Sequence, residues 1–165
     1  MTTNITYHSN DPSTGLTMHI NPDCFKLYCG DTGLFVTLAF WDSDFTSNVI
    51  YQKLLTDKLT ADLGYVHENI VSQMLVAVGK KLYYHTWLTG DRKRNYEVDF
   101  LIPDGGKINA IEVKSSQSKQ HASIDNFVQK YSTRIQQSYL IHGKDLRKDG
   151  SLKCLPSYMP PILVE

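Results

Sequence analysis

Several stretches of the chain carry apolar residues at the spacing of an amphipathic helix. In the clearest of them the apolar positions recur every three or four residues from Val66 to Val78, and Gly79 can supply a left-handed stop. In another, the Asp31-Thr32 pair can cap the first turn of a helix. The predicted helices cover residues 32–40, 46–60, 65–78 and 125–131.

A second pattern, rich in β-branched and aromatic residues, predicts short strands. These segments are KLYYHTW (81–87), YEVDFLI (96–102), INAIEVKS (108–115) and SYLIHG (138–143). The turn sequence PDGGK (103–107) joins the second and third of them into a hairpin. A helix, three strands, a helix and a strand in this order predict an α/β fold with a mixed β-sheet flanked by helices.

The two ends of the chain show weaker patterns. Residues 1–24 are rich in Asn, Asp, Thr, Ser, Pro and Gly, and we expect an N-terminal arm with one short strand near 16–20. The tail over 144–165 carries three prolines and is expected to be extended. The rest forms one domain over 25–165, with a small helical part at 25–60 and an α/β core at 61–143.

The hairpin holds the most informative polar residues. Strand alternation puts Glu97 and Asp99 on one face of the first strand, together with Leu101. The other, apolar face holds Tyr96, Val98, Phe100 and Ile102. The partner strand can pair in two registers, and only the second sets Asp99 opposite Glu112. In that register both carboxylates are expected on one face.

Two opposed carboxylates need compensation. At a separation of about 5 Å they repel by roughly 3 kcal/mol when the effective dielectric constant is about 20. A hard divalent cation offsets this repulsion, and Mg²⁺ typically binds one or two carboxylates, waters and a substrate phosphate. Lys114, on the face of Glu112, can then orient or deprotonate a water. A raised carboxyl pKa and a plain Glu112–Lys114 ion pair on a solvated face stay open as alternatives.

Composition and charge limit the class of protein. The 17 basic and 17 acidic residues balance, which removes the general attraction expected of a non-specific DNA-binding protein. Arg92, Lys93 and Arg94 form the tightest basic cluster and are the expected weak contacts for nucleic acid, unless they are solvated loop charge. No apolar run is long enough to span a membrane, and three cysteines without repeated spacing favour the cytoplasm.

Four segments, taken in order, resemble a known family. They are FKLYCGDTGL, GYVHENIVSQML, EVDFLI and IEVKSS. An acidic helix followed by an Asp strand and an E-x-K strand is similar to the core of the PD-(D/E)XK nuclease-like superfamily, a restriction-endonuclease-like mixed sheet. More narrowly, the segments resemble a domain at the C-terminus of prokaryotic AAA-type ATPases. The chain lacks the phosphate-binding motif G-x-x-x-x-G-K-[ST], so the resemblance implies this domain without its ATPase.

The resemblance implies that the domain over 25–165 is nuclease-like and gives four residues a role. Glu68, Asp99 and Glu112 would hold Mg²⁺ or Mn²⁺, and Lys114 would assist the water that hydrolyses DNA phosphodiester bonds. The helix over 65–78 is expected to pack on the sheet through Ile70, Val71 and Met74, and to direct Glu68 toward Asp99.

Two functions therefore stay open. The first is a metal-dependent endo- or exonuclease acting on DNA. The second is a catalytically inactive module, derived from an AAA-type ATPase, that binds protein or nucleic acid. An ATPase supplied by another chain and a homodimer also stay open as partners, whereas no membrane association is expected.

Overall fold

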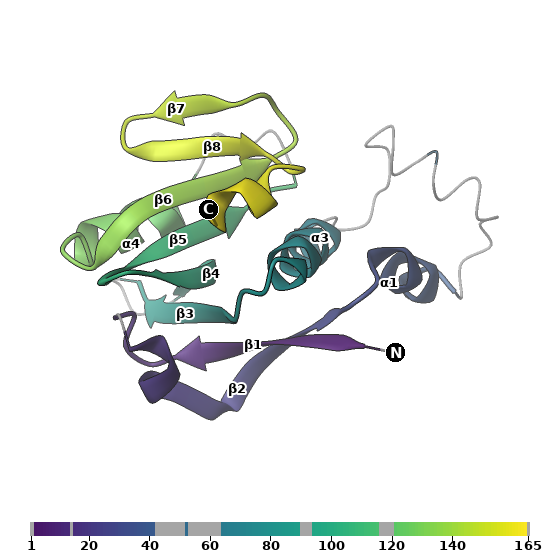
Figure 1. The fold of residues 1–165 in the computed structure, drawn as a ribbon, viewed down its shortest axis with the longest axis horizontal. Coiled ribbons are helices and arrows are strands. Elements are labelled where there is room, and N and C mark those ends of the chain that lie inside the picture. Colours follow the sequence, from purple (N-terminus) through teal and green to yellow (C-terminus); the bar gives the residue numbers. More distant parts are fainter. Residues whose placement is uncertain are drawn as a thin grey trace.

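The computed structural model describes residues 2–13, 15–41, 52, 64–89, 94–115 and 121–164 (Figure 1). These ranges contain eight strands, three α-helices and two short 3-10 helices. Their order is β1 (Thr3–Ser9), η1 (Leu16–His19), β2 (Ile20–Cys29), α1 (Thr32–Ala39), α3 (Gly64–Ala77), β3 (Leu82–Leu88), β4 (Asn95–Asp104), β5 (Lys107–Val113), α4 (Ala122–Lys130), β6 (Ile135–His142), β7 (Arg147–Asp149), β8 (Leu152–Pro156) and η2 (Pro160–Val164).

The eight strands form one mixed sheet in the order β2-β1-β3-β4-β5-β6-β8-β7. Three neighbouring pairs are parallel, namely β1 with β3, β5 with β6 and β6 with β8. The parallel connection from β5 to β6 runs through α4, which is the usual form of such a crossover. The predicted α/β class with a mixed sheet and flanking helices is therefore confirmed.

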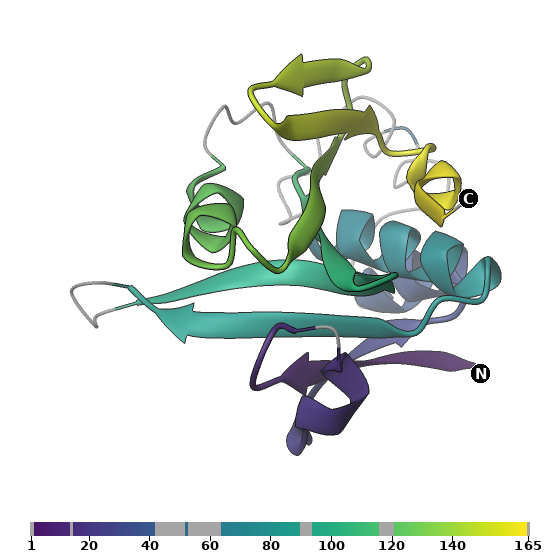
Figure 2. The same ribbon diagram turned by 60° about the vertical axis from the view of Figure 1, so that its left-hand side comes forward.

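The helices cover both faces of the sheet (Figures 1 and 2). On one face Phe127 of α4 packs in a buried cluster that includes Leu101 of β4. On the other face Leu75 of α3 packs in a cluster that includes Phe100 of β4. The sheet thus has a buried core on each side, and its central strands are apolar on both faces.

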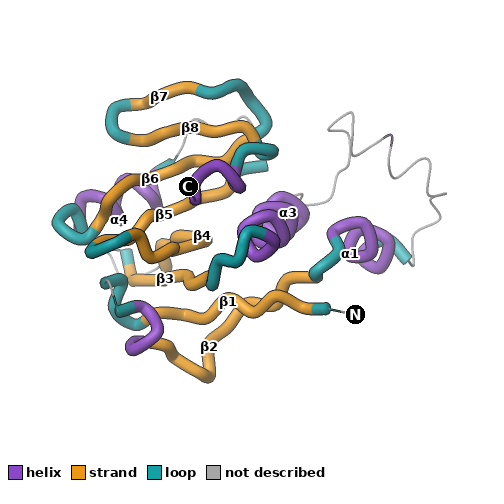
Figure 3. Tube along the Cα trace, in the orientation of Figure 1, coloured by secondary structure: helices purple, strands orange, loops and turns teal. Residues whose placement is uncertain are grey.

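The N-terminal segment departs most from its sequence prediction (Figure 3). In place of an arm with a strand near 16–20, β1 pairs with both β2 and β3, and Leu16–His19 forms a 3-10 helix. Residues 25–29 lie in β2 and not in a helical part. The sequence does not predict β2 because it is an edge strand with many exposed residues, so its sequence shows no alternation of buried and exposed positions.

The C-terminal tail is also not simply extended. β7 and β8 form a hairpin, and β8 continues the sheet in parallel beside β6. Leu152, Cys154 and Leu155 of β8 are buried in the two cores. Pro156 ends the strand and Pro160 begins η2, so the prolines lie where strand pairing stops.

Three helices confirm their predictions with small shifts. In α1 the Asp31 carboxylate accepts a hydrogen bond from the Leu34 N–H at 3.0 Å, as expected of a cap. α3 matches the strongest helical pattern closely, whereas α4 begins at Ala122, before the predicted start. The helix predicted over 46–60 lies outside the described residues, apart from Gln52. No helix in the described ranges is long and apolar enough to cross a membrane.

α3 is fixed to β2 by a buried amide. The Asn69 side chain accepts a hydrogen bond from the Cys29 N–H at 2.7 Å and donates to the Cys29 carbonyl at 3.0 Å. It also donates to the Thr32 hydroxyl at 2.8 Å. Val71 packs on the sheet as predicted, but Ile70 packs with the small cluster between α1 and α3. This anchoring sets the position of Glu68, the residue before Asn69.

The turn between β4 and β5 is tighter than the five-residue loop predicted from the sequence. The ladder extends to the pair Asp104↔Lys107, so only Gly105 and Gly106 form the turn. Gly105 has φ of +56°, in the left-handed region where a side chain is unfavourable. Such two-residue glycine turns match the twist of a β-hairpin and fix its register.

Candidate active site

The register of the hairpin is the second of the two predicted. Ile102 pairs with Asn109, and Phe100 pairs with Ile111. The ladder ends at this pair, and the same register continued by one position sets Asp99 opposite Glu112. The second predicted register is therefore confirmed for the hairpin up to Phe100 and Ile111.

A β-bulge in β4 changes which side chains share a face. Asp99 and Phe100 together oppose the single Tyr84 of β3. A bulge interrupts strand alternation and re-aims side chains. Leu101 consequently packs in the core on the α4 side, although strict alternation places it with Asp99, and Phe100 packs on the α3 side.

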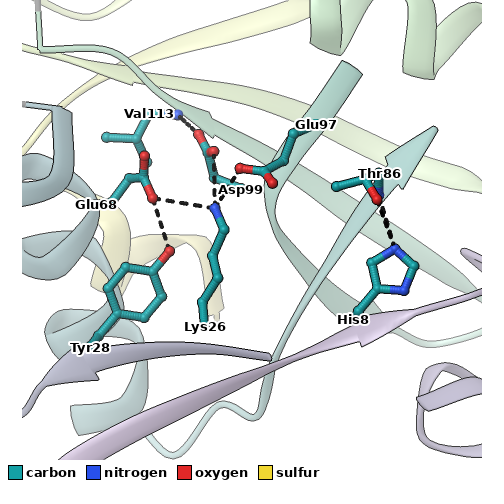
Figure 4. A network of polar contacts seen from close by, with 8 residues as sticks. All are labelled: His8, Lys26, Tyr28, Glu68, Thr86, Glu97, Asp99 and Val113. Atoms are coloured by element: carbon teal, nitrogen blue, oxygen red, sulfur yellow. Dashed lines mark hydrogen bonds and ion pairs between the residues drawn. The ribbon is translucent and has the colours of Figure 1, made fainter. Parts of the chain in front are cut away.

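The ammonium group of Lys26, on β2, lies among three carboxylates (Figure 4). Its Nζ is 2.5 Å from Glu97 Oε1 and 3.4 Å from Glu68 Oε2. The third carboxylate, that of Asp99, is 4.0 Å away. Burial alone lowers the pKa of Lys26, but the three carboxylates outweigh burial and raise this pKa above its ordinary value. Lys26 is therefore a permanent cation in the cluster.

Glu68 reaches this cluster from the face of α3 that packs on the sheet. It lies one turn before Val71, which is fully buried against the sheet. The Tyr28 hydroxyl, from β2, donates a hydrogen bond to Glu68 Oε2 at 2.9 Å. Burial, followed by the charge of Glu68, raises the pKa of Tyr28 and keeps its hydroxyl protonated. The expectation that α3 directs Glu68 toward Asp99 agrees with this geometry.

The surroundings of Asp99 favour the protonated form of its carboxyl group. Its side chain is 11% exposed, and its Oδ2 accepts a hydrogen bond from the Val113 N–H at 2.7 Å. Burial, and next the negative charge of Glu68, raise the pKa of Asp99 to about 8, although Lys26 and the Val113 N–H act in the opposite direction. The cluster thus holds more negative charge than its ammonium groups balance.

Glu112 and Lys114 form the other half of the site. The Glu112 side chain is 3% exposed, and its Oε1 lies 2.6 Å from Lys114 Nζ. Its Oε2 accepts a hydrogen bond from the Ile124 N–H at 3.0 Å, in the first turn of α4, where a negative charge is favourable. Burial lowers the pKa of Lys114, but the hydrogen bond and charge of Glu112 raise it above its ordinary value. The Glu112–Lys114 ion pair left open by the sequence is therefore present, with its carboxylate buried and not solvated.

The two halves interact by charge, but their side chains have different neighbours. Asp99 faces Lys26 and α3, whereas Glu112 reaches Lys114 and α4. The expected placement of both carboxylates on one face is thus not what these contacts show, because the bulge turns Asp99 toward α3. Over the described ranges, no group of three or more His, Cys, Asp or Glu side chains is placed to hold a metal ion. The pKa of Lys114 still responds to Asp99 and Glu68, so the halves lie within electrostatic range.

Lys26 and Tyr28 are the site residues that sequence reasoning missed. The two-residue spacing of K-L-Y places them on one face of a strand, which is the one local signal available. The sequence pattern predicts a helical part over 25–60, and the two-residue spacing indicates a shared face only once this segment is known to be a strand. Glu97 was grouped with Asp99 by strand alternation, and both do contact Lys26.

The basic cluster expected to contact nucleic acid lies at the loop between β3 and β4. Arg92 and Lys93 fall outside the described residues. Arg94 is exposed, and its carbonyl accepts a hydrogen bond from the Thr89 N–H at 2.8 Å across the hairpin. A nucleic-acid contact at this loop remains a prediction.

Comparison with known proteins finds one family. The family described as Domain of unknown function (DUF4143) matches residues 63–157. This segment contains Glu68, Asp99, Glu112 and Lys114, whereas β1 and β2 precede it, so Lys26 lies outside it. No curated protein and no solved structure matched the chain.

Proposed function

Since the chain belongs to the family described as Domain of unknown function (DUF4143), we propose, from that premise and from the charges of the site, that it is a metal-dependent phosphodiesterase acting on DNA. The observation that carries this proposal is an imbalance of charge. Within the described residues two ammonium groups, those of Lys26 and Lys114, meet four carboxylates, those of Glu68, Glu97, Asp99 and Glu112. The fully ionised cluster has an excess of two negative charges, which is the charge that one divalent cation neutralises.

The chemistry of the donors fits such a cation. Carboxylate oxygens are the ligands that Mg²⁺ and Mn²⁺ prefer, and one or two of them suffice where waters and a substrate phosphate fill the other positions. Glu68 and Asp99, which share Lys26, are the residues we propose to hold the ion, whereas Glu112 binds Lys114 and the Ile124 N–H. When bound, the ion would supply Lewis-acid polarisation of a phosphodiester and lower the pKa of water. The order of these acids along the chain, with Lys114 two residues after Glu112, also resembles that of the PD-(D/E)XK nuclease-like superfamily and its restriction-endonuclease-like fold.

The chain's own groups have distinct parts in this proposal. Tyr28 fixes one oxygen of Glu68 by its hydrogen bond. Glu112 is held by the Ile124 N–H and in turn holds the ammonium of Lys114. The Lys114 side chain is 34% exposed and is a cation, so it would bind a phosphate oxygen and orient the substrate. Its raised pKa keeps the ammonium protonated, so it has no free lone pair with which to accept a proton from water.

A different observation favours the second candidate function, a non-catalytic interaction module derived from an AAA-type ATPase. Lys26 already lies among three of the carboxylates, so this part of the network has a cation without any metal. In that case the buried charges stabilise one conformation of the fold, and an ATPase chain, DNA or a second copy would bind elsewhere.

Cleavage assays with metal separate the two functions. The wild type is incubated with linear double-stranded and single-stranded DNA in the presence of Mg²⁺ or Mn²⁺, beside Glu112→Gln, Lys114→Met and the surface control Asp145→Asn. A phosphodiesterase should cut with metal, lose at least about 100-fold in rate in the two site variants, and keep its rate in the control. Absence of cleavage and of any metal-dependent rise in Tm with either ion would contradict the proposal and leave the interaction module.

A further inference from the structure

Lys26 occupies the position at which carboxylates from two different elements converge, and this has a consequence for cation binding. We infer that Lys26 is an internal counter-ion that competes with the divalent cation, so that the cation binds only when the ammonium group leaves. This inference rests on the proposed function, and it assigns a control of that same site to a residue outside the family segment at 63–157.

The distances set the ammonium group and a divalent ion in competition for the same oxygens. Nζ of Lys26 lies 2.5 Å from Glu97 and 3.4 Å from Glu68. Mg²⁺ binds its oxygen ligands at about 2.0–2.1 Å, so an ion shared by Glu68 and Asp99 would lie within a few ångströms of the ammonium. Two cations that close repel strongly in a half-buried site. Either the ammonium or the divalent ion neutralises these acids.

The surroundings give the ammonium a place to go. The Lys26 side chain is 23% exposed, and its partner Glu97 is 37% exposed, so the cluster opens to solvent on this side. Lys26 Nζ also lies 5.3 Å from the centroid of the Tyr84 ring, within the range of a cation–π contact. A displaced ammonium can therefore keep Glu97 and the Tyr84 ring as neighbours while it gives up Glu68 and Asp99. The long flexible stem of lysine permits this change without movement of β2.

The inference predicts how substitutions of one residue change the affinity for the cation. Lys26→Met removes the competing charge and keeps most of the apolar stem, and Lys26→Gln is a second neutral variant that retains donors toward the carboxylates. Lys26→Arg keeps the charge. Lys81→Met, at an exposed lysine outside the cluster, is the control for loss of a surface charge.

The full chain and these variants are titrated with Mg²⁺ alone and with Mn²⁺ alone, and Tm is recorded at each concentration. The two neutral variants should reach half of the metal-induced rise in Tm at a concentration at least about 10-fold lower than the wild type. Lys26→Arg and Lys81→Met should behave like the wild type. If Lys26→Met unfolds without metal, recovery of its folding transition on addition of Mg²⁺ supports the inference, and Lys26→Gln provides the affinity.

Two other results contradict it in different ways. Equal responses of all proteins would refute competition by Lys26 and leave the proposed metal site in place. No response of any protein, the neutral variants included, would remove the metal site and with it both the proposed function and this inference.

Discussion

Replacement of Asp99 by asparagine tests whether the cluster holds an excess of negative charge. Asparagine has the shape of aspartate and keeps an oxygen that can accept the Val113 N–H, which lies 2.7 Å from the present carboxylate. The substitution removes the carboxyl group that titrates at this position. The variant should therefore differ from the wild type chiefly in the pH dependence of its stability.

The sign follows from the two protonation states. Burial and the charge of Glu68 raise the pKa of Asp99 from 3.8 to about 8 in the folded protein. Between these values the folded state holds a proton that the unfolded chain releases, so a rise in pH favours unfolding. The stability that Asp99 contributes is complete below its unfolded pKa and is lost as the pH rises through its folded pKa.

The magnitude follows from the same linkage. One proton released on unfolding changes the free energy of unfolding by about 1.4 kcal/mol per pH unit. The difference in this free energy between Asp99→Asn and the wild type should therefore increase by roughly 3 kcal/mol from pH 5 to pH 7, with the variant gaining. Other titrating groups are common to both proteins and largely cancel in the difference.

Urea denaturation of both proteins at pH 5, 6 and 7 measures this difference. Asp145→Asn, the same substitution at an exposed position, should change stability by no more than about 0.5 kcal/mol. A difference for Asp99→Asn that stays constant with pH would refute the reasoning, because Asp99 would then be ionised in the folded protein throughout this range.

Two further predictions concern the contacts that position the site, beside the metal titrations and cleavage assays proposed above. Asn69→Ala removes the hydrogen bonds to Cys29 and Thr32 and leaves buried backbone groups of Cys29 unpaired. Urea denaturation should therefore show that the free energy of unfolding falls by about 3–5 kcal/mol. A decrease below about 1 kcal/mol would contradict the view that Asn69 clamps α3 to β2. Gly105→Ala places a side chain at φ of +56° with no atom within 4 Å of the new Cβ, so backbone strain alone should cost about 1–2 kcal/mol by the same measurement. Gly143→Ala, equally open but without a positive φ, should change stability by less than about 0.5 kcal/mol, and equal effects of the two substitutions would refute the strain argument.

The sequence predicts best the elements whose packing is periodic along the chain itself. α3 and the β4–β5 hairpin have such a pattern, because each is buried over most of its length on a core face. The register of the hairpin was narrowed to two choices, of which the structure has the second. The sequence does not predict β1, β2 or the β7–β8 hairpin. β2 and β7 are the edge strands of the sheet and carry many exposed residues, and β1 and β8, one position further in, show no strict alternation of buried and exposed positions.

The candidate site shows the same limit at the level of single residues. Glu68, Asp99, Glu112 and Lys114 were named from a motif, and the structure brings them within electrostatic range of one another. The bulge at Asp99 was not predictable, since it depends on the pairing of β4 with β3, which is not encoded in the local pattern of either strand.

Because Lys26 lies outside the family segment, this segment alone does not contain the complete site. β2 is held to α3 by Asn69, and this clamp fixes the distance between Lys26 and Glu68, which are 42 residues apart in the chain. Without β2 the cluster would keep four carboxylates and one ammonium group, and its excess of negative charge would rise from two to three. A site with that excess has to bind a cation, take up protons or separate its acids. β2 therefore sets the charge balance of a site whose motif residues all lie in the family segment at 63–157.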